Sequence, residues 1–132
     1  MKLTTPTALP LSLALIALLE AEISKANLPA GEGLILNFKD PNYSAETGGF
    51  HPVEIAINAE GKLLYITDFA YYGQGLYAEL GKSLDFDFSY GLFQQMGRDY
   101  PLHEGAQLFA LWQQNFCSYV TWGVFEVKYS VL

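Results

Sequence analysis

The sequence predicts a single α+β domain, in which a mostly antiparallel sheet of four to six strands packs against two main helices. Three observations favour this class. The 132 residues are a usual length for one domain. Hydrophobic residues make up 51% of the chain and charged residues 16%, which predicts a folded core rather than disorder. The strand-like segments do not alternate regularly with helices, so parallel crossovers are not required throughout.

Two segments have the spacing of main helices. Ser12 is a favoured N-cap residue for a helix over about residues 13–25. Pro101 suits the first position of a second helix, over about residues 102–119. Both segments repeat apolar residues at intervals of three and four, which predicts that one side of each helix packs on the sheet.

Six segments have the alternation or the apolar content of strands: 34–38, 53–57, 62–69, 85–88, 92–95 and 124–131. Both sides of segment 62–69 are apolar, which predicts a central strand covered on two faces and makes Asp68, near its end, unusual. Residues 70–75 are expected to form a loop. Residues 76–84 are expected to form a short helix, which Gly81 weakens.

Charged residues are few, and acidic residues outnumber basic ones. The net charge is −7, and the seven basic residues are scattered with no two adjacent. A surface for phosphates or anionic lipids needs clustered basic side chains, so we expect no direct nucleic acid binding and no membrane binding. Cys117 is the single cysteine, which excludes an intrachain disulfide and does not support a thiolate metal site. We expect no metal ion and no cofactor.

The N-terminal segment 8–19 is apolar, but it is too short to span a bilayer. As a secretory signal it would follow a single basic residue, Lys2, and it is interrupted by Pro10. We therefore predict a cytoplasmic protein, in which this segment leads into the first helix.

Two connections hold most of the side chains suited to binding. The first spans residues 40–54 and the second residues 70–75. Loop aromatics beside carboxylates suit an unknown protein partner or a small molecule, so we predict a non-enzymatic interaction or ligand-binding domain. The apolar excess is also compatible with a homodimer. The candidate binding residues are Asp40, Tyr43, Glu46, Phe50, His51, Asp68, Tyr71 and Tyr72.

Two other functions stay open. An enzyme or divalent-metal site would combine His51 and Asp68. It would add the Asp85/Asp87 pair, whose carboxylates share one side of a strand. His51 and Glu54 cannot converge locally, because residues three apart on an extended chain point to opposite faces. The remaining alternative is an acidic decoy of a nucleic-acid-binding protein, which would need a continuous stripe of carboxylates.

Four motifs resemble those of a small bacterial family of unknown function. They are F-K-D-P-N-Y-S-A-E-T-G-G-F-H-P-V-E-I at residues 38–55, Y-I-T-D-F-A-Y at 65–71, L-D-F-D-F-S at 84–89 and L-W-Q-Q-N-F at 111–116. The resemblance extends from about residue 9 to residue 130. It implies a stand-alone intracellular domain, and it carries over no catalytic residue, cofactor or substrate.

Overall fold

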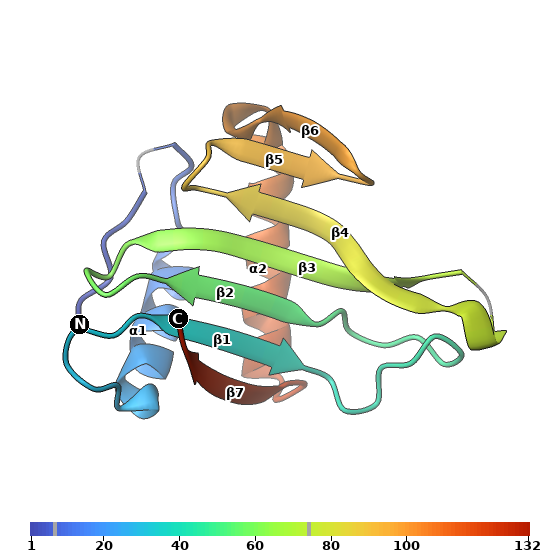
Figure 1. Ribbon diagram of the computed structural model, residues 1–132, viewed down its shortest axis with the longest axis horizontal. Helices are drawn as coiled ribbons and strands as arrows, with labels where there is room; N and C mark the ends of the chain where they lie inside the picture. Colours follow the sequence, from blue (N-terminus) through green and yellow to red (C-terminus); the bar gives the residue numbers. More distant parts are fainter. Residues whose placement is uncertain (7, 74) are drawn as a thin grey trace.

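In the computed structural model, which describes residues 1–6, 8–73 and 75–132, seven strands form one antiparallel sheet in the order β6-β5-β4-β3-β2-β1-β7 (Figure 1). The predicted class is correct, and the predicted count of four to six strands is wrong. The strands are β1 (Leu34–Lys39), β2 (Val53–Ile57), β3 (Leu63–Tyr72), β4 (Glu79–Asp87), β5 (Leu92–Gln95), β6 (Arg98–Pro101) and β7 (Glu126–Val131).

Both helices lie on the same face of the sheet (Figure 1). Helix α1 spans Leu13–Ala26, and its first turn is capped by Ser12, whose Oγ accepts a hydrogen bond from the Leu15 amide at 3.1 Å. Helix α2 spans Ala106–Thr121 and follows a 3₁₀ turn, η2 (Leu102–Gly105). Pro101 ends β6 instead of opening a helix, so the predicted start of the second helix corresponds to η2. No helix in the described part of the chain is long and apolar enough to cross a membrane.

The expected helix over residues 76–84 is wrong, because most of this segment belongs to β4. Residues 70–72, expected in a loop, extend β3, and the two strands pair with Tyr72 opposite Glu79. Gly81, which was expected to weaken a helix, lies under the ring of Tyr72. Beyond the strand end, Gly75–Tyr77 form a 3₁₀ turn, η1. Gln74, part of the expected loop, lies outside the described residues.

The helix-side face of the sheet carries the core. Alternate residues of β3 divide between the two faces: Ile66 is fully buried on the helix side, opposite Ile55 and Phe86. The intervening Tyr65 and Thr67 lie on the other face, which no described helix covers (Figure 1). The expectation that this strand is covered on both faces is therefore wrong. Its apolar content reflects aromatic side chains on an open face.

An aromatic cluster joins the sheet to α2. The ring of Phe86 lies 5.3 Å from that of Phe93, 4.8 Å from that of Phe109 and 6.1 Å from that of Trp112, measured between centroids. The last two residues are on α2, and Phe93 is on β5. This cluster fixes the height of α2 above the sheet, and thereby the position of the helix residues that face the 49–53 segment.

Candidate functional site

The connection between β1 and β2 is held by Asp40, which is buried. Its Oδ1 accepts a hydrogen bond from the Asn42 amide at 2.9 Å, and its Oδ2 accepts one from the Phe50 amide at 3.1 Å. Gly49 adopts a φ of +139°, and a Cβ there would lie 2.9 Å from Asp40 Oδ2. Asp40, a predicted binding residue, therefore shapes this connection from inside.

His51 meets Asp68 across the sheet. Val53 of β2 pairs with Asp68 of β3, which brings His51, two residues before the start of β2, alongside the carboxylate. His51 Nδ1 lies 2.7 Å from Asp68 Oδ1. The indole Nε1 of Trp112, on α2, donates to Asp68 Oδ2 at 2.9 Å. Each carboxylate oxygen therefore has a donor from a different element, and the network ties the β1–β2 connection to the helix.

These residues line a pocket of about 240 Å³ between the 49–53 segment and α2. Phe50, His51 and Asp68 were expected at a common site, and they do meet there. The helix residues of this pocket were not among the predicted binding residues, because the spacing of Trp112, Phe116 and Tyr119 favoured core packing. The lining residues are Gly49, Phe50, His51, Val53, Asp68, Trp112, Asn115, Phe116, Tyr119 and Phe125.

Asp68 raises the pKa of His51 above its usual 6.5, chiefly through the hydrogen bond to the ring and further through its negative charge. Partial burial of the ring opposes this shift. The ring of Tyr43 lies against the imidazole, at 5.6 Å between centroids. The raised pKa favours the imidazolium, which donates from Nδ1 to the carboxylate and keeps a second N–H on Nε2.

His51→Gln is expected to remove a pH-dependent part of the stability. A raised folded-state pKa stabilises the fold fully below the unfolded value of about 6.5, and this contribution is lost as the pH rises through the folded value. The loss should stay below about 1 kcal/mol, because a partly exposed pair is screened by solvent. Urea denaturation of both proteins from mildly acidic to mildly alkaline pH measures the difference. A difference that is constant over this range would contradict the assignment.

The remaining candidates do not line this pocket. The ring of Tyr43 stacks on that of Tyr71 at 5.2 Å, and its hydroxyl accepts the Tyr71 amide hydrogen at 3.1 Å. Both line a separate hollow of about 300 Å³ on the uncovered face of the sheet. Tyr72 donates its hydroxyl to the Lys82 carbonyl at 2.9 Å. Glu46 is exposed in the β1–β2 connection. The predicted site is thus divided between two faces of the sheet.

The alternative site that adds Asp85 and Asp87 to His51 and Asp68 does not form. Asp85 lies on the uncovered face, where its Oδ1 accepts from Thr67 Oγ1 at 2.8 Å, whereas Asp68 faces α2. Asp87 Oδ1 accepts hydrogen bonds from Ser89 and closes the following turn. Glu54 accepts from Tyr65 and does not meet His51. Within residues 1–6, 8–73 and 75–132, no three His, Cys, Asp or Glu side chains form a cluster that could hold a metal ion.

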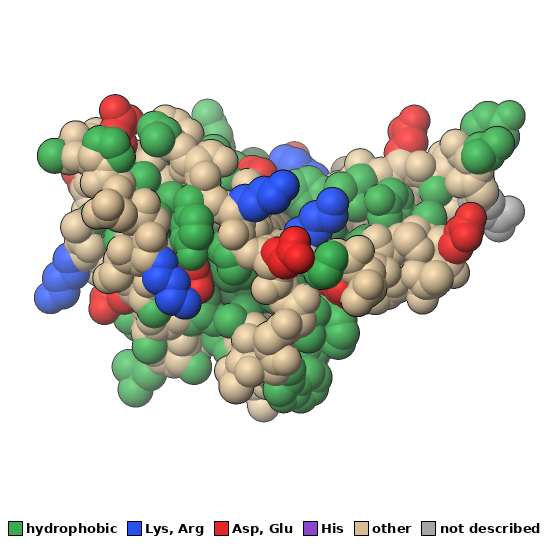
Figure 2. Space-filling view, turned by 90° about the horizontal axis from the view of Figure 1, so that it is seen from below, with side chains coloured by type: hydrophobic (Ala, Val, Ile, Leu, Met, Phe, Trp, Pro, Cys, Tyr) green, Lys and Arg blue, Asp and Glu red, His purple; other side chains and the backbone are tan. Residues whose placement is uncertain are grey.

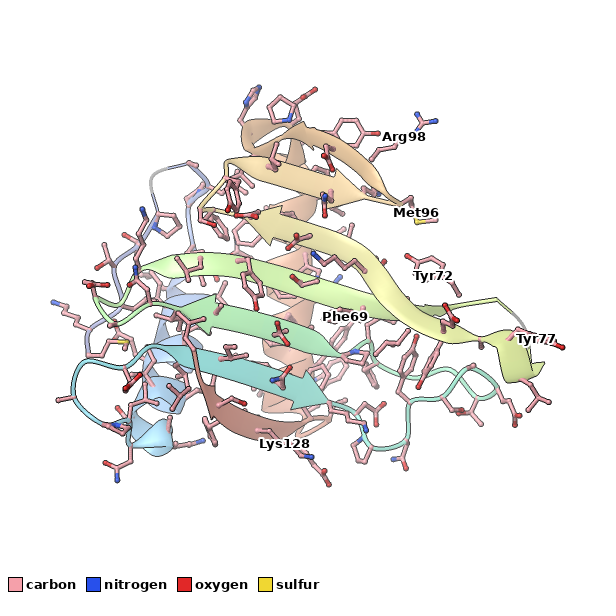
Figure 3. All side chains as sticks on the ribbon, viewed as in Figure 1. Phe69, Tyr72, Tyr77, Met96, Arg98 and Lys128 are labelled. Carbon is pink, nitrogen blue, oxygen red and sulfur yellow. The ribbon has the colours of Figure 1, made fainter. Side chains whose placement is uncertain are left out.

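The ends of β3 and β4 project beyond the rest of the molecule (Figures 1 and 2). We call residues 69–73 and 75–82 the β3–β4 arm. Phe69 lies near its base, and Tyr72 and Tyr77 lie farther out (Figure 3). Leu76 is 101% exposed and Tyr77 88% exposed, so the end of the arm presents apolar side chains to solvent. The β1–β2 connection runs along the arm and contacts it through Tyr43 and Tyr71.

Comparisons with known proteins place the fold in a family. Residues 13–130 match the family described as Protein of unknown function (DUF2787). A structure of the hypothetical protein VC0508, from the VSP-II pathogenicity island of Vibrio cholerae, is 38% identical with a TM-score of 0.82, over 97% of this chain and 98% of that chain. No curated protein matches the chain.

A second similar structure is a conserved hypothetical protein, VC1805, from the VPI-2 pathogenicity island of Vibrio cholerae. It is 38% identical with a TM-score of 0.81, over 96% of this chain and 98% of that chain, and it is described as sharing structural homology with the human P32 protein. The similarity covers nearly the whole of each chain. The resemblance to a family of unknown function is confirmed.

Proposed function

Because the chain belongs to the DUF2787 family, whose function is unknown, we propose from its geometry that it is a non-enzymatic protein-binding domain. Its docking surface is the β3–β4 arm together with the adjoining uncovered face of the sheet. The observation that carries the proposal is the high exposure of Leu76 and Tyr77 at the end of a projecting hairpin. Contiguous exposed apolar side chains on a folded domain mark interaction surfaces.

The uncovered face continues this surface toward the centre of the sheet. Two hollows, of about 300 Å³ and about 420 Å³, both include Glu54 and Phe69 in their lining. Tyr71 lines the first and Tyr65 lines the second. Aromatic side chains are enriched at the centres of protein interfaces, because they bury a large area at a low cost in conformational entropy. The surface therefore fits a protein that offers an apolar groove to the end of the arm.

The other functions have less support. The His51–Asp68 pair has no Ser, Thr, Cys or Lys beside it in the described pocket lining, so no activated nucleophile accompanies it. For an acidic decoy, the carboxylates would have to lie on the surface, and those of Glu22, Asp40 and Asp85 are buried. We retain the cytoplasm as the expected location and a second copy of the chain as one partner to be tested.

The double variant Leu76→Ser/Tyr77→Ser is expected to fold normally and to lose the partner. Both side chains are fully or almost fully exposed, so their replacement removes no core contact. A photo-crosslinking residue at position 77 of the otherwise unchanged chain would identify what touches the arm, and the double variant should fail to retain that protein. Cross-links to a second copy would identify a homodimer.

Leu13→Ser is the matched control. Leu13 is 86% exposed, but it lies on α1, on the other side of the sheet from the proposed surface. The control should retain the partner at the wild-type level. Equal retention by the double variant, or equal loss in the control, would contradict the proposal that the arm is the docking surface.

A further inference from the structure

The pocket between the 49–53 segment and α2 is distinct from the docking surface, and we propose that it binds a small aromatic carboxylate. The ring of the ligand would lie among the aromatic walls, and its carboxylate would accept a hydrogen bond from His51. The pocket volume of about 240 Å³ is below the range of roughly 300–1,000 Å³ typical of sites for drug-sized molecules, so the ligand is small.

The polar end of the pocket is a donor whose orientation is fixed. Asp68 receives one hydrogen bond from His51 Nδ1 and another from Trp112 Nε1, so both of its oxygens are engaged. The His51 ring is held by this contact, and its Nε2 has no partner among the described residues. The imidazole side chain is 43% exposed, against 13% for the carboxylate of Asp68. An imidazolium N–H directed at an anionic oxygen forms a charge-assisted hydrogen bond.

The apolar walls come from three parts of the chain. On α2, the rings of Trp112 and Phe116 are stacked at 4.8 Å with an interplanar angle of 14°. Phe50, from the β1–β2 connection, meets Tyr119 edge to face at 4.6 Å. Phe125 closes the side next to β7. A flat aromatic ring can make offset or edge contacts with such walls, which favours it over a compact aliphatic group.

The charged and polar side chains of the pocket favour a ligand with a carboxylate over a cationic or a purely apolar ligand. Asp68 is the sole carboxylate in the described lining, and its existing donors compete with any cationic ligand. A hydrocarbon without an oxygen would leave the His51 donor and the Asn115 amide at the pocket wall without a partner. In a ligand with one aromatic ring and one carboxylate, the ring can contact the apolar walls and the carboxylate can accept the hydrogen bond from His51.

Benzoate is a direct probe, with benzyl alcohol as its uncharged counterpart. We expect millimolar benzoate to shift the indole N–H resonance of Trp112 in heteronuclear NMR spectra, with Trp122→Phe used to assign the two indole signals. Benzoate should bind at least about tenfold more tightly than benzyl alcohol, which corresponds to about 1.4 kcal/mol. Leu76→Ser/Tyr77→Ser should bind benzoate like the wild type, so failure of the docking surface and failure of this site are distinguishable.

Asn115→Trp tests the location of the site. Asn115 is an exposed residue of α2 that lines the pocket, so a larger side chain there should fill the pocket without disturbing the core. Gln107→Trp places the same side chain at another exposed position of α2, outside the pocket. Loss of the benzoate shifts in Asn115→Trp alone is the expected result. Equal binding of the two probes, no shift at Trp112, or unchanged binding by Asn115→Trp would each overturn the proposal.

Discussion

Phe86→Ala is expected to lower the free energy of unfolding by about 3–5 kcal/mol. Phe86 is 0% exposed and contacts Phe93, Phe109 and Trp112, so its removal leaves a cavity where β4, β5 and α2 meet. A domain of this size has a total stability of about 5–15 kcal/mol, so the variant should lose a large share of it. Urea denaturation followed by circular dichroism measures the loss.

Two controls separate a cavity from a general effect of substitution. Phe86→Leu keeps most of the apolar volume and should cost clearly less than the alanine variant. Leu13→Ala removes a side chain that is 86% exposed and should change the stability by less than about 0.5 kcal/mol. If Phe86→Ala were as stable as Leu13→Ala, the aromatic cluster would not hold α2 on the sheet.

The sequence predicted those parts of the fold whose signals are local. The helix over residues 13–25 follows an N-cap at Ser12, and the structure has it at Leu13–Ala26. The strand predicted at 53–57 has the bounds of β2. In both segments the apolar residues recur at regular intervals, because one side of each element contacts the core. A pattern of this kind can be read without knowledge of the partner element.

The arm could not be predicted in the same way. Most of residues 76–84 do not pack on the core. The positions of their apolar residues therefore do not indicate which side of the segment is buried. Their strand conformation depends on pairing with β3, which is set by the register of Tyr72 with Glu79. The same lack of a core explains why Leu76, the first residue of the expected helix, is fully exposed at the end of the hairpin.

The site was predictable in part for a similar reason. Asp68 stood out because it is a carboxylate at the end of an apolar strand. Its contact with His51 follows from the pairing of Val53 with Asp68, which the sequence does not reveal. Trp112 lies 44 positions from Asp68 in the sequence. One signal for its role was present, since a Trp in a buried stripe needs an acceptor for its indole N–H.

Asp68→Ala is expected to lower the free energy of unfolding by about 1–3 kcal/mol. The main cause is the indole N–H of Trp112, which donates to Asp68 Oδ2 at 2.9 Å and would be left buried without an acceptor. His51 contributes less, because its ring is partly exposed and can turn to water. Asp68→Asn retains one carbonyl oxygen, which can accept from one of the two donors, and should show an intermediate loss.

A double-mutant cycle with Trp112→Phe isolates this contact. Phenylalanine keeps an aromatic ring against Phe116 and carries no N–H, so Asp68→Ala should cost less in the Trp112→Phe background than in the wild type. The difference between the two costs is the coupling between the indole and the carboxylate. A coupling near zero would show that Trp112 does not depend on Asp68 as its acceptor. A clear coupling would establish that the Asp68 carboxylate helps to hold the aromatic wall contributed by α2.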